Sequence, residues 1–166
     1  MKKKYTISIF TEHFIGILNQ ITIIFTRRGV NIDGLTASES KEDGIYRMTI
    51  EVTTDEAQVV QLVKQIERII DVIKAFYYVD DEVVFQELAL YKLPVSSLEP
   101  RLEKVIRQFN AHIISAEQDF VVIELTGHKE DTQALLEILK DFDLLEFARS
   151  GRVAVSKPMQ TLDQYL

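Results

Sequence analysis

Hydrophobic and polar residues alternate at the start of the chain and then change to a helical spacing. Tyr5, Ile7 and Ile9 occupy alternate positions, which is typical of a half-buried strand. Residues 16–28 instead carry apolar side chains three and four positions apart. These are Ile17, Leu18, Ile21, Ile24 and Phe25. Gly29 is expected to end this helix in the left-handed conformation, so the pattern predicts a strand followed by a helix.

The rest of the first half completes a small α+β unit. Strands are expected at residues 31–39 and 45–53, joined by a polar hairpin loop that ends in Gly44. Thr54 and Asp55 cap a second helix, whose apolar side is Val59, Leu62, Val63, Ile66 and Ile70. A strand at 71–79 closes the unit. The order is β-α-β-β-α-β, a ferredoxin-like arrangement with both helices on one face of the sheet.

The same order begins again after the acidic break Asp80-Asp81-Glu82. The second half predicts a strand at 83–93, a helix from Ser96, a hairpin of 111–116 and 120–125, a helix at 130–140 and a strand at 144–155. Ser96 and Glu99 match a capping box. Asn110 stands where the first half has Gly29, and Asn is also accepted in the left-handed cap. The fold class is therefore α+β, with two tandem ferredoxin-like βαββαβ units.

This repeat sets the expected domains. Residues 1–80 form the first domain, 81–158 form the second, and 159–166 form a tail that is either frayed or used in contacts.

One edge of the first unit carries features that suit a small anion. The helix begins at Gly16, where unpaired N–H groups can hold a carboxylate and no side chain blocks its approach. Asn31 lies at the start of the next strand, and we expect it at the same edge. Glycine is also common in tight turns, and Asn is common after a helix end. The residues alone leave an amino-acid pocket and two ordinary turns about equally supported.

The second unit lacks this feature in the sequence. Ser96 is expected to cap its first helix, and Pro100 removes one N–H donor. A pocket of this type is therefore predicted in the first unit.

Composition narrows the function classes. The formal net charge of −7 argues against nucleic acid, and no cysteine is present for disulfides, thiolate metal sites or cysteine catalysis. His13, His112 and His128 have no metal-ligand spacing, so no metal site is expected, and no catalytic constellation is found. No apolar stretch reaches the roughly 20 residues of a membrane helix, and no export signal follows Met1, so a cytoplasmic protein is predicted.

At this point the chain resembles the small regulatory subunit of acetolactate (acetohydroxyacid) synthase. An ACT domain is matched by residues 5–79, through Gly16-Ile-Leu18, Phe25-Thr-Arg-Arg-Gly-Val-Asn-Ile-Asp-Gly-Leu35 and Tyr46-Arg-Met-Thr-Ile50. The C-terminal domain of the family is matched by residues 87–158, above all by Ala148-Arg-Ser-Gly151.

The resemblance implies a non-catalytic partner of a large thiamine-diphosphate enzyme, which it activates and makes sensitive to valine. The cofactors, thiamine diphosphate, Mg and FAD, are then expected in the catalytic subunit and none in this chain. In the family the effector lies between the ACT domains of a homodimer. The matching positions are His13, Gly16, Ile17, Leu18, Asn31 and Ile32.

The chain departs from the family at the glycine turn. His13 stands where the family usually has Asn, and Phe14 and Ile15 replace small or polar residues. One methylene gives only about 1–3 kcal/mol of discrimination, so valine, leucine and isoleucine all remain candidate effectors.

The ARSG stretch has two interpretations. The resemblance assigns Arg149, Ser150 and Gly151 to a subunit contact, whereas a β-bulge with solvated arginines is the structural alternative. At the level of function, the alternatives are a stand-alone ACT-type amino-acid sensor that regulates another enzyme and, from a different class, an enzyme on a ferredoxin-like fold.

Overall fold

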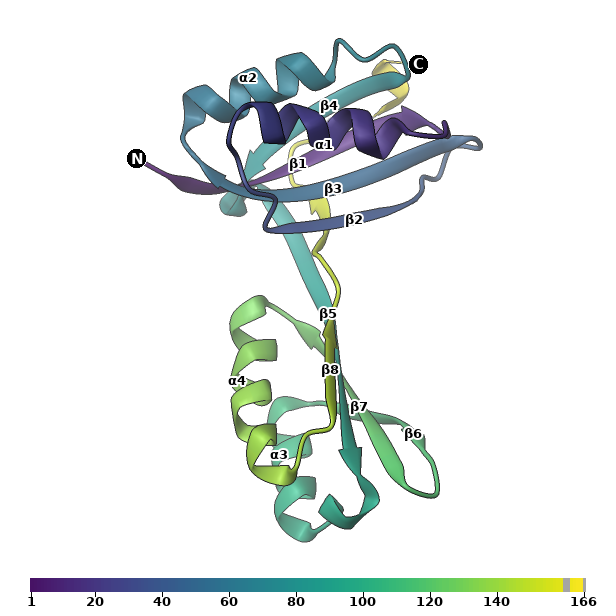
Figure 1. Ribbon diagram of the computed structural model, residues 1–166, viewed down its shortest axis with the longest axis vertical. Coiled ribbons are helices and arrows are strands. Elements are labelled where there is room, and N and C mark those ends of the chain that lie inside the picture. Colours follow the sequence, from purple (N-terminus) through teal and green to yellow (C-terminus); the bar gives the residue numbers. More distant parts are fainter. Residues whose placement is uncertain (160–161, 166) are drawn as a thin grey trace. The chain divides into compact units, whose positions relative to one another are not determined.

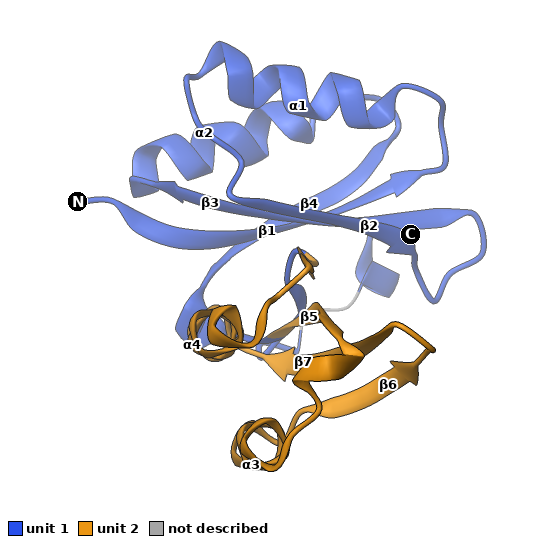
Figure 2. Cartoon of the chain, turned by 60° about the horizontal axis from the view of Figure 1, so that its bottom comes forward, with its two compact units in different colours: residues 1–85, 151–166 blue, residues 86–150 orange. Residues whose placement is uncertain are grey.

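The computed structural model describes residues 1–159 and 162–165, and it contains two compact units. The first comprises residues 1–85 and 151–166, and the second comprises residues 86–150 (Figure 2). These compact units differ from the predicted domains, whose boundaries were placed at 80/81 and 158/159. Residues 81–85 and the segment from Gly151 onward belong to the first unit, because they pack on the sheet of that unit. Residues 160, 161 and 166 of the predicted tail lie outside the described residues.

The first unit has the predicted order of elements. They are β1 (Lys3–Glu12), α1 (Ile17–Arg27), β2 (Gly34–Glu39), β3 (Ile45–Thr54), α2 (Glu56–Ile66), β4 (Val72–Val79) and the 3₁₀ turn η1 (Asp80–Glu82). The sheet order is β2-β3-β1-β4, with neighbouring strands antiparallel. Both helices cover one face of this sheet (Figure 1).

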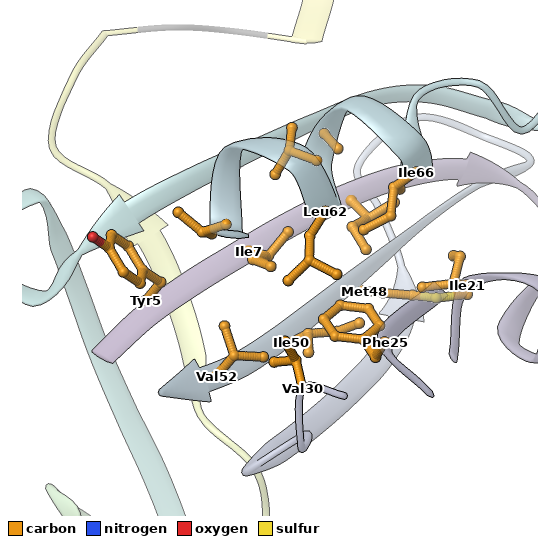
Figure 3. Packing of buried hydrophobic residues seen from close by; sticks show 14 of the residues in the cluster. Tyr5, Ile7, Ile21, Phe25, Val30, Met48, Ile50, Val52, Leu62 and Ile66 are labelled. Carbon is orange, nitrogen blue, oxygen red and sulfur yellow. The ribbon is translucent and has the colours of Figure 1, made fainter. Parts of the chain in front are cut away.

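Alternation along the strands gives this sheet one apolar face. Tyr5, Ile7 and Ile9 of β1 point toward the helices and are almost fully buried. They pack with Phe25 of α1 and Leu62 of α2 (Figure 3). Fully burying a side chain of this size stabilises the fold by about 1.5–3 kcal/mol. Ile70, which was predicted on the apolar side of the second helix, is exposed because it lies beyond the end of α2.

The second unit repeats the arrangement. It begins within β5 (Val83–Pro94), at Gln86. Its other elements are the 3₁₀ turn η2 (Val95–Ser97), α3 (Pro100–Phe109), β6 (His112–Ala116), β7 (Phe120–Gly127), α4 (Lys129–Leu139), the 3₁₀ turn η3 (Lys140–Phe142) and β8 (Glu146–Arg149). The order β6-β7-β5-β8 matches that of the first sheet. The predicted fold class, two ferredoxin-like βαββαβ units, is confirmed.

The predicted closing strand at 144–155 is two strands. β8 ends at Arg149, and a separate strand, β9 (Val153–Ser156), follows after Ser150-Gly151-Arg152. Both pair with β5, and Lys157 N donates a hydrogen bond to Glu82 O, just before that strand. The chain ends in the 3₁₀ turn η4 (Leu162–Gln164). Among the described residues, no helix is long and apolar enough to span a membrane.

Candidate functional site

The turn before α1 leaves backbone donors free. Gly16 is the N-cap residue with φ of 89°, and no side chain caps the helix. Ile17 N donates to Phe14 O at 3.3 Å. The N–H groups of Leu18 and Asn19 have no hydrogen-bond acceptor in the described part of the chain. Free N–H groups at the positive end of a helix dipole favour an anion, so this turn can hold a carboxylate.

The conformation of Gly16 explains why a glycine stands at this position. A Cβ atom built on it would meet nothing within 4 Å, so space alone does not require glycine. The positive φ does, because L-residues other than Asn and Asp rarely adopt it.

Apolar side chains surround the mouth of this turn. Phe14, Ile15 and Leu18 are 50, 95 and 42% exposed. His13 is exposed and stacks on Tyr46, with ring centroids 4.0 Å apart. Ile17 differs from the other predicted contacts, because its side chain lies in the core and only its backbone faces the turn. The turn therefore combines free backbone N–H donors with an apolar surface around them.

Asn31 and Ile32 do not lie at the same edge as Gly16, which corrects the sequence interpretation. They follow α1, whose 11 residues span about 16 Å, so the two features lie at opposite ends of the helix. The sheet register agrees. Glu12, which precedes the glycine turn, pairs with Ile45, whereas Asp33 N bonds to Glu51 O. These two positions on β3 are separated by about 20 Å. One chain therefore cannot bring both features to one amino acid.

The start of α3 also differs from the prediction. Ser96 does not cap it: the helix begins at Pro100, and the N-cap Glu99 makes no side-chain cap hydrogen bond. Ser97 instead donates from Oγ to Phe142 O at 2.6 Å inside the second unit. The absence of a capping side chain thus does not distinguish the two helices. Pro100 still does, because it has no N–H to offer.

The ARSG residues have partners within the chain. Arg149 Nε lies 3.1 Å from Glu87 Oε1, and both side chains are largely buried. Ser150 and Leu88 exchange two hydrogen bonds: Ser150 N donates to Leu88 O and Leu88 N donates to Ser150 Oγ, each at 2.9 Å. The arginines are thus not solvated as the β-bulge alternative supposed. Contact with another subunit at Arg149, Ser150 and Gly151 stays a prediction.

Gly151 and Arg152 attach the returning chain to the first sheet. A Cβ atom on Gly151 would lie 3.0 Å from Leu35 N and O, so a side chain would collide with the backbone of β2. Arg152 is 4% exposed, and its Nε lies 2.9 Å from Glu51 Oε2. Its Nη1 contacts Asp80 Oδ1 at 2.7 Å and donates to Thr6 Oγ1 at 2.9 Å. Three elements of the first unit are therefore joined by one guanidinium.

The sequence pattern did not predict that this polar face is buried. Thr6, Ser8, Thr49 and Glu51 alternate with the core residues, a pattern that ordinarily indicates a solvated face. All four are less than 10% exposed. The available signal was the number of polar residues on β1 and β3, where Arg47 and Glu51 share one face of the same strand.

In a comparison with known proteins, each of the two units matches a family model. Residues 7–74 match the model of the AHAS small subunit-like ACT domain. Residues 86–158 match the model of the small subunit of acetolactate synthase.

Individual relatives agree over nearly the whole length. The chain is 34% identical to the acetolactate synthase small subunit of Aquifex aeolicus, over 98% of this chain and 85% of that protein. It is 33% identical to that of Bacillus subtilis, over 96 and 93%. The crystal structure of the small subunit from Thermotoga maritima superposes with a TM-score of 0.85 at 26% identity, over 93% of this chain and 98% of that one. With both units matched in order, the chain belongs to the acetolactate synthase small subunit family.

Proposed function

We propose that the chain is the regulatory, non-catalytic subunit of an acetolactate synthase in branched-chain amino-acid biosynthesis. The observation that carries this proposal is the match of both units, in order, to this family. The large catalytic subunit is then its partner, in the cytoplasm. Thiamine diphosphate, Mg and FAD belong to that partner, and this chain holds none of them. Its role is to activate the large subunit and to confer feedback inhibition.

The effector is valine or a related aliphatic amino acid. The glycine turn supports this choice, because the free N–H groups of Leu18 and Asn19 suit a carboxylate. The exposed side chains of Phe14, Ile15 and Leu18 suit an aliphatic group. Asn31 and Ile32 lie too far away in the same chain. The second half of the pocket therefore comes from a second copy, and the ACT domains form a homodimer.

Feedback then works by a shift between two arrangements of the dimer. A ligand bound between two ACT domains favours one arrangement only as far as it binds that arrangement more tightly. The catalytic subunit responds to this shift through its contact elsewhere on the chain.

The test is calorimetric titration with valine, leucine and isoleucine, combined with activity of the reconstituted enzyme. Gly16→Asp places a carboxylate beside the ligand carboxylate, and we expect it to abolish binding and feedback while activation remains. Gly16→Asn is the matched control, because Asn has nearly the size of Asp and also tolerates a positive φ but carries no charge, and we expect it to weaken binding less than Gly16→Asp does. Loss of activation together with feedback in Gly16→Asp would make the glycine purely structural. Failure of the chain to co-purify with the large subunit would favour a stand-alone amino-acid sensor.

A further inference from the structure

The first unit contains a second pocket, on the face of its sheet opposite to the helices. Its volume is about 560 Å³, within the range of small-molecule sites. Its floor is formed by β1, β2 and β3, and β9 with Leu162 covers one side. Hydroxyl groups dominate the polar part of the lining, from Ser8, Thr36, Ser38, Thr49 and Tyr78.

Arg47 of β3 lines this pocket without a counter-ion. Its Nη2 donates to Ser8 Oγ at 3.2 Å and to the carbonyl oxygen of Ala154, and its guanidinium carbon lies 5.4 Å from the centroid of the Phe10 ring. Nε is buried and has no partner among the described residues. Burial lowers the pKa of this guanidinium below its ordinary value. A largely buried cation held only by neutral groups has lost hydration that these groups replace incompletely.

Arg152, the other arginine on this face, has the carboxylate partners that Arg47 lacks. Arg152 is held by Glu51 at 2.9 Å and by Asp80 at 2.7 Å, so its charge is neutralised inside the unit. Arg47 has no carboxylate within ion-pair distance in the part of the chain that the structure describes. On this face, carboxylates of the protein therefore neutralise Arg152, whereas Arg47 lies beside an open pocket.

The other two charges of the lining are one anion, Glu39, and one cation, Lys41. Glu39 contributes a carboxylate, which accepts a hydrogen bond from Tyr46 Oη at 3.3 Å. Lys41 contributes a second cation, paired with Glu42 and Asp163 at the rim. Glu42 and Asp163 offset Lys41, so Arg47 is the cation of the lining that lacks a carboxylate partner among the described residues. A guanidinium and several hydroxyls form a donor set that fits the oxygens of a carboxylate or a phosphate.

We propose that this pocket binds a small oxyanion, with Arg47 as its counter-ion. The site is distinct from the effector turn, because Gly16 lies at the helix layer and Arg47 lies on the opposite face of the sheet. Phe10 and Phe76 line the apolar part, which suits a ligand that carries a short carbon group beside its anionic end.

The first experiment is calorimetric titration of the full chain with potassium phosphate and, separately, with sodium acetate, at ionic strength held constant with chloride. Saturable binding of one probe identifies which oxyanion the site prefers. Arg47→Gln removes the charge and should weaken binding at least about tenfold. Arg68→Gln removes an exposed arginine from the turn that follows α2, outside the pocket, and should leave the affinity unchanged. The titrations are repeated in Gly16→Asp, so that binding at the effector turn does not contribute.

A second variant tests the site without removing the arginine. Ser38 is the cross-strand partner of Arg47 and lines the same pocket. Ser38→Glu therefore supplies an internal carboxylate, which should raise the melting temperature and abolish oxyanion binding. If Arg47→Gln fails to fold, this variant decides the outcome. Binding of neither probe by the wild type, or unchanged affinity in a folded Ser38→Glu chain, would overturn the proposal.

Discussion

At the scale of single residues, the first unit is held together by charges on the sheet face that its helices do not cover. Arg152 joins β1, β3 and η1 through Thr6, Glu51 and Asp80, and its guanidinium stacks 3.7 Å from the Phe85 ring. Lys4 adds a second ion pair to Glu51 at 3.3 Å. Buried ion pairs add little over a well-packed apolar substitute, yet breaking one by removing a single partner is costly.

We predict that Arg152→Ala lowers the free energy of unfolding by about 3–5 kcal/mol, because the buried Glu51 loses its main counter-ion. Urea unfolding measures the change. The control is Arg107→Ala, which removes the exposed partner of Glu103 at 3.9 Å and should cost less than about 0.5 kcal/mol. Equal effects of the two substitutions would contradict the structural role of Arg152.

At the scale of elements, the helices of the chain differ in whether a side chain caps their first turn. The N-cap Asp55 of α2 accepts a hydrogen bond from Gln58 N at 2.9 Å, as the sequence predicts for a capping residue. Glu99 before α3 has an extended backbone suited to an N-cap, but its side chain makes no cap hydrogen bond. The end of α3 is as predicted: Asn110 adopts φ of 53°, as Gly29 does after α1 with 62°.

Substitutions at the two N-caps should therefore have opposite signs. Asp55→Ala removes a bond that is present, and we expect it to lower the free energy of unfolding by about 1 kcal/mol. Glu99→Ser adds a side chain that can reach the first free N–H groups of α3, and we expect a gain of about 0.5–1 kcal/mol. Thermal and urea unfolding measure both. Asp55→Asn serves as the control that preserves the cap, and a loss in Glu99→Ser would exclude the capping explanation.

At the scale of the whole molecule, the first unit is assembled from both ends of the chain. Ala154 and Leu162 are buried in it, and Tyr165 makes an edge contact with Phe76 at 5.6 Å between centroids. Of the predicted tail, Leu162 and Tyr165 are thus used in contacts, whereas Met159 is exposed. The polar sheet face could not remain buried without this returning segment.

Ending the chain after Ser150 should selectively loosen the first unit. We expect amide hydrogen exchange in β1 and β3 to rise at least about tenfold, because Glu51 loses Arg152 and the face becomes open to water. Exchange in β7 and α4 is the internal control and should change little, since residues 86–150 retain their own core. Uniform acceleration in both units would contradict this division.

The sequence predicted the elements well where local patterns decide them. Apolar residues at alternate positions in β1, and three or four positions apart in α1, show which face of each element is buried. This pattern depends only on residues close together in the sequence. The left-handed end of α1 could be predicted at Gly29 because that conformation favours glycine, whereas the positive φ of Gly16 was not predicted. The failures concern partners far apart in the chain. The strand at 144–155 was predicted as continuous because apolar alternation does not report that Gly151 approaches the backbone of Leu35.

By itself the sequence therefore determined the two βαββαβ units, the glycine turn before α1 and the resemblance to the acetolactate synthase small subunit family. Only the tertiary structure decided that Asn31 lies at the opposite edge from Gly16, that Arg152 neutralises Glu51, and that Arg47 is left beside an open pocket. The physical reason is that the spacing of hydrophobic residues, which indicates helices and strands, depends only on residues close together in the sequence. Charge pairing and the covering of a polar face instead depend on which distant segments meet.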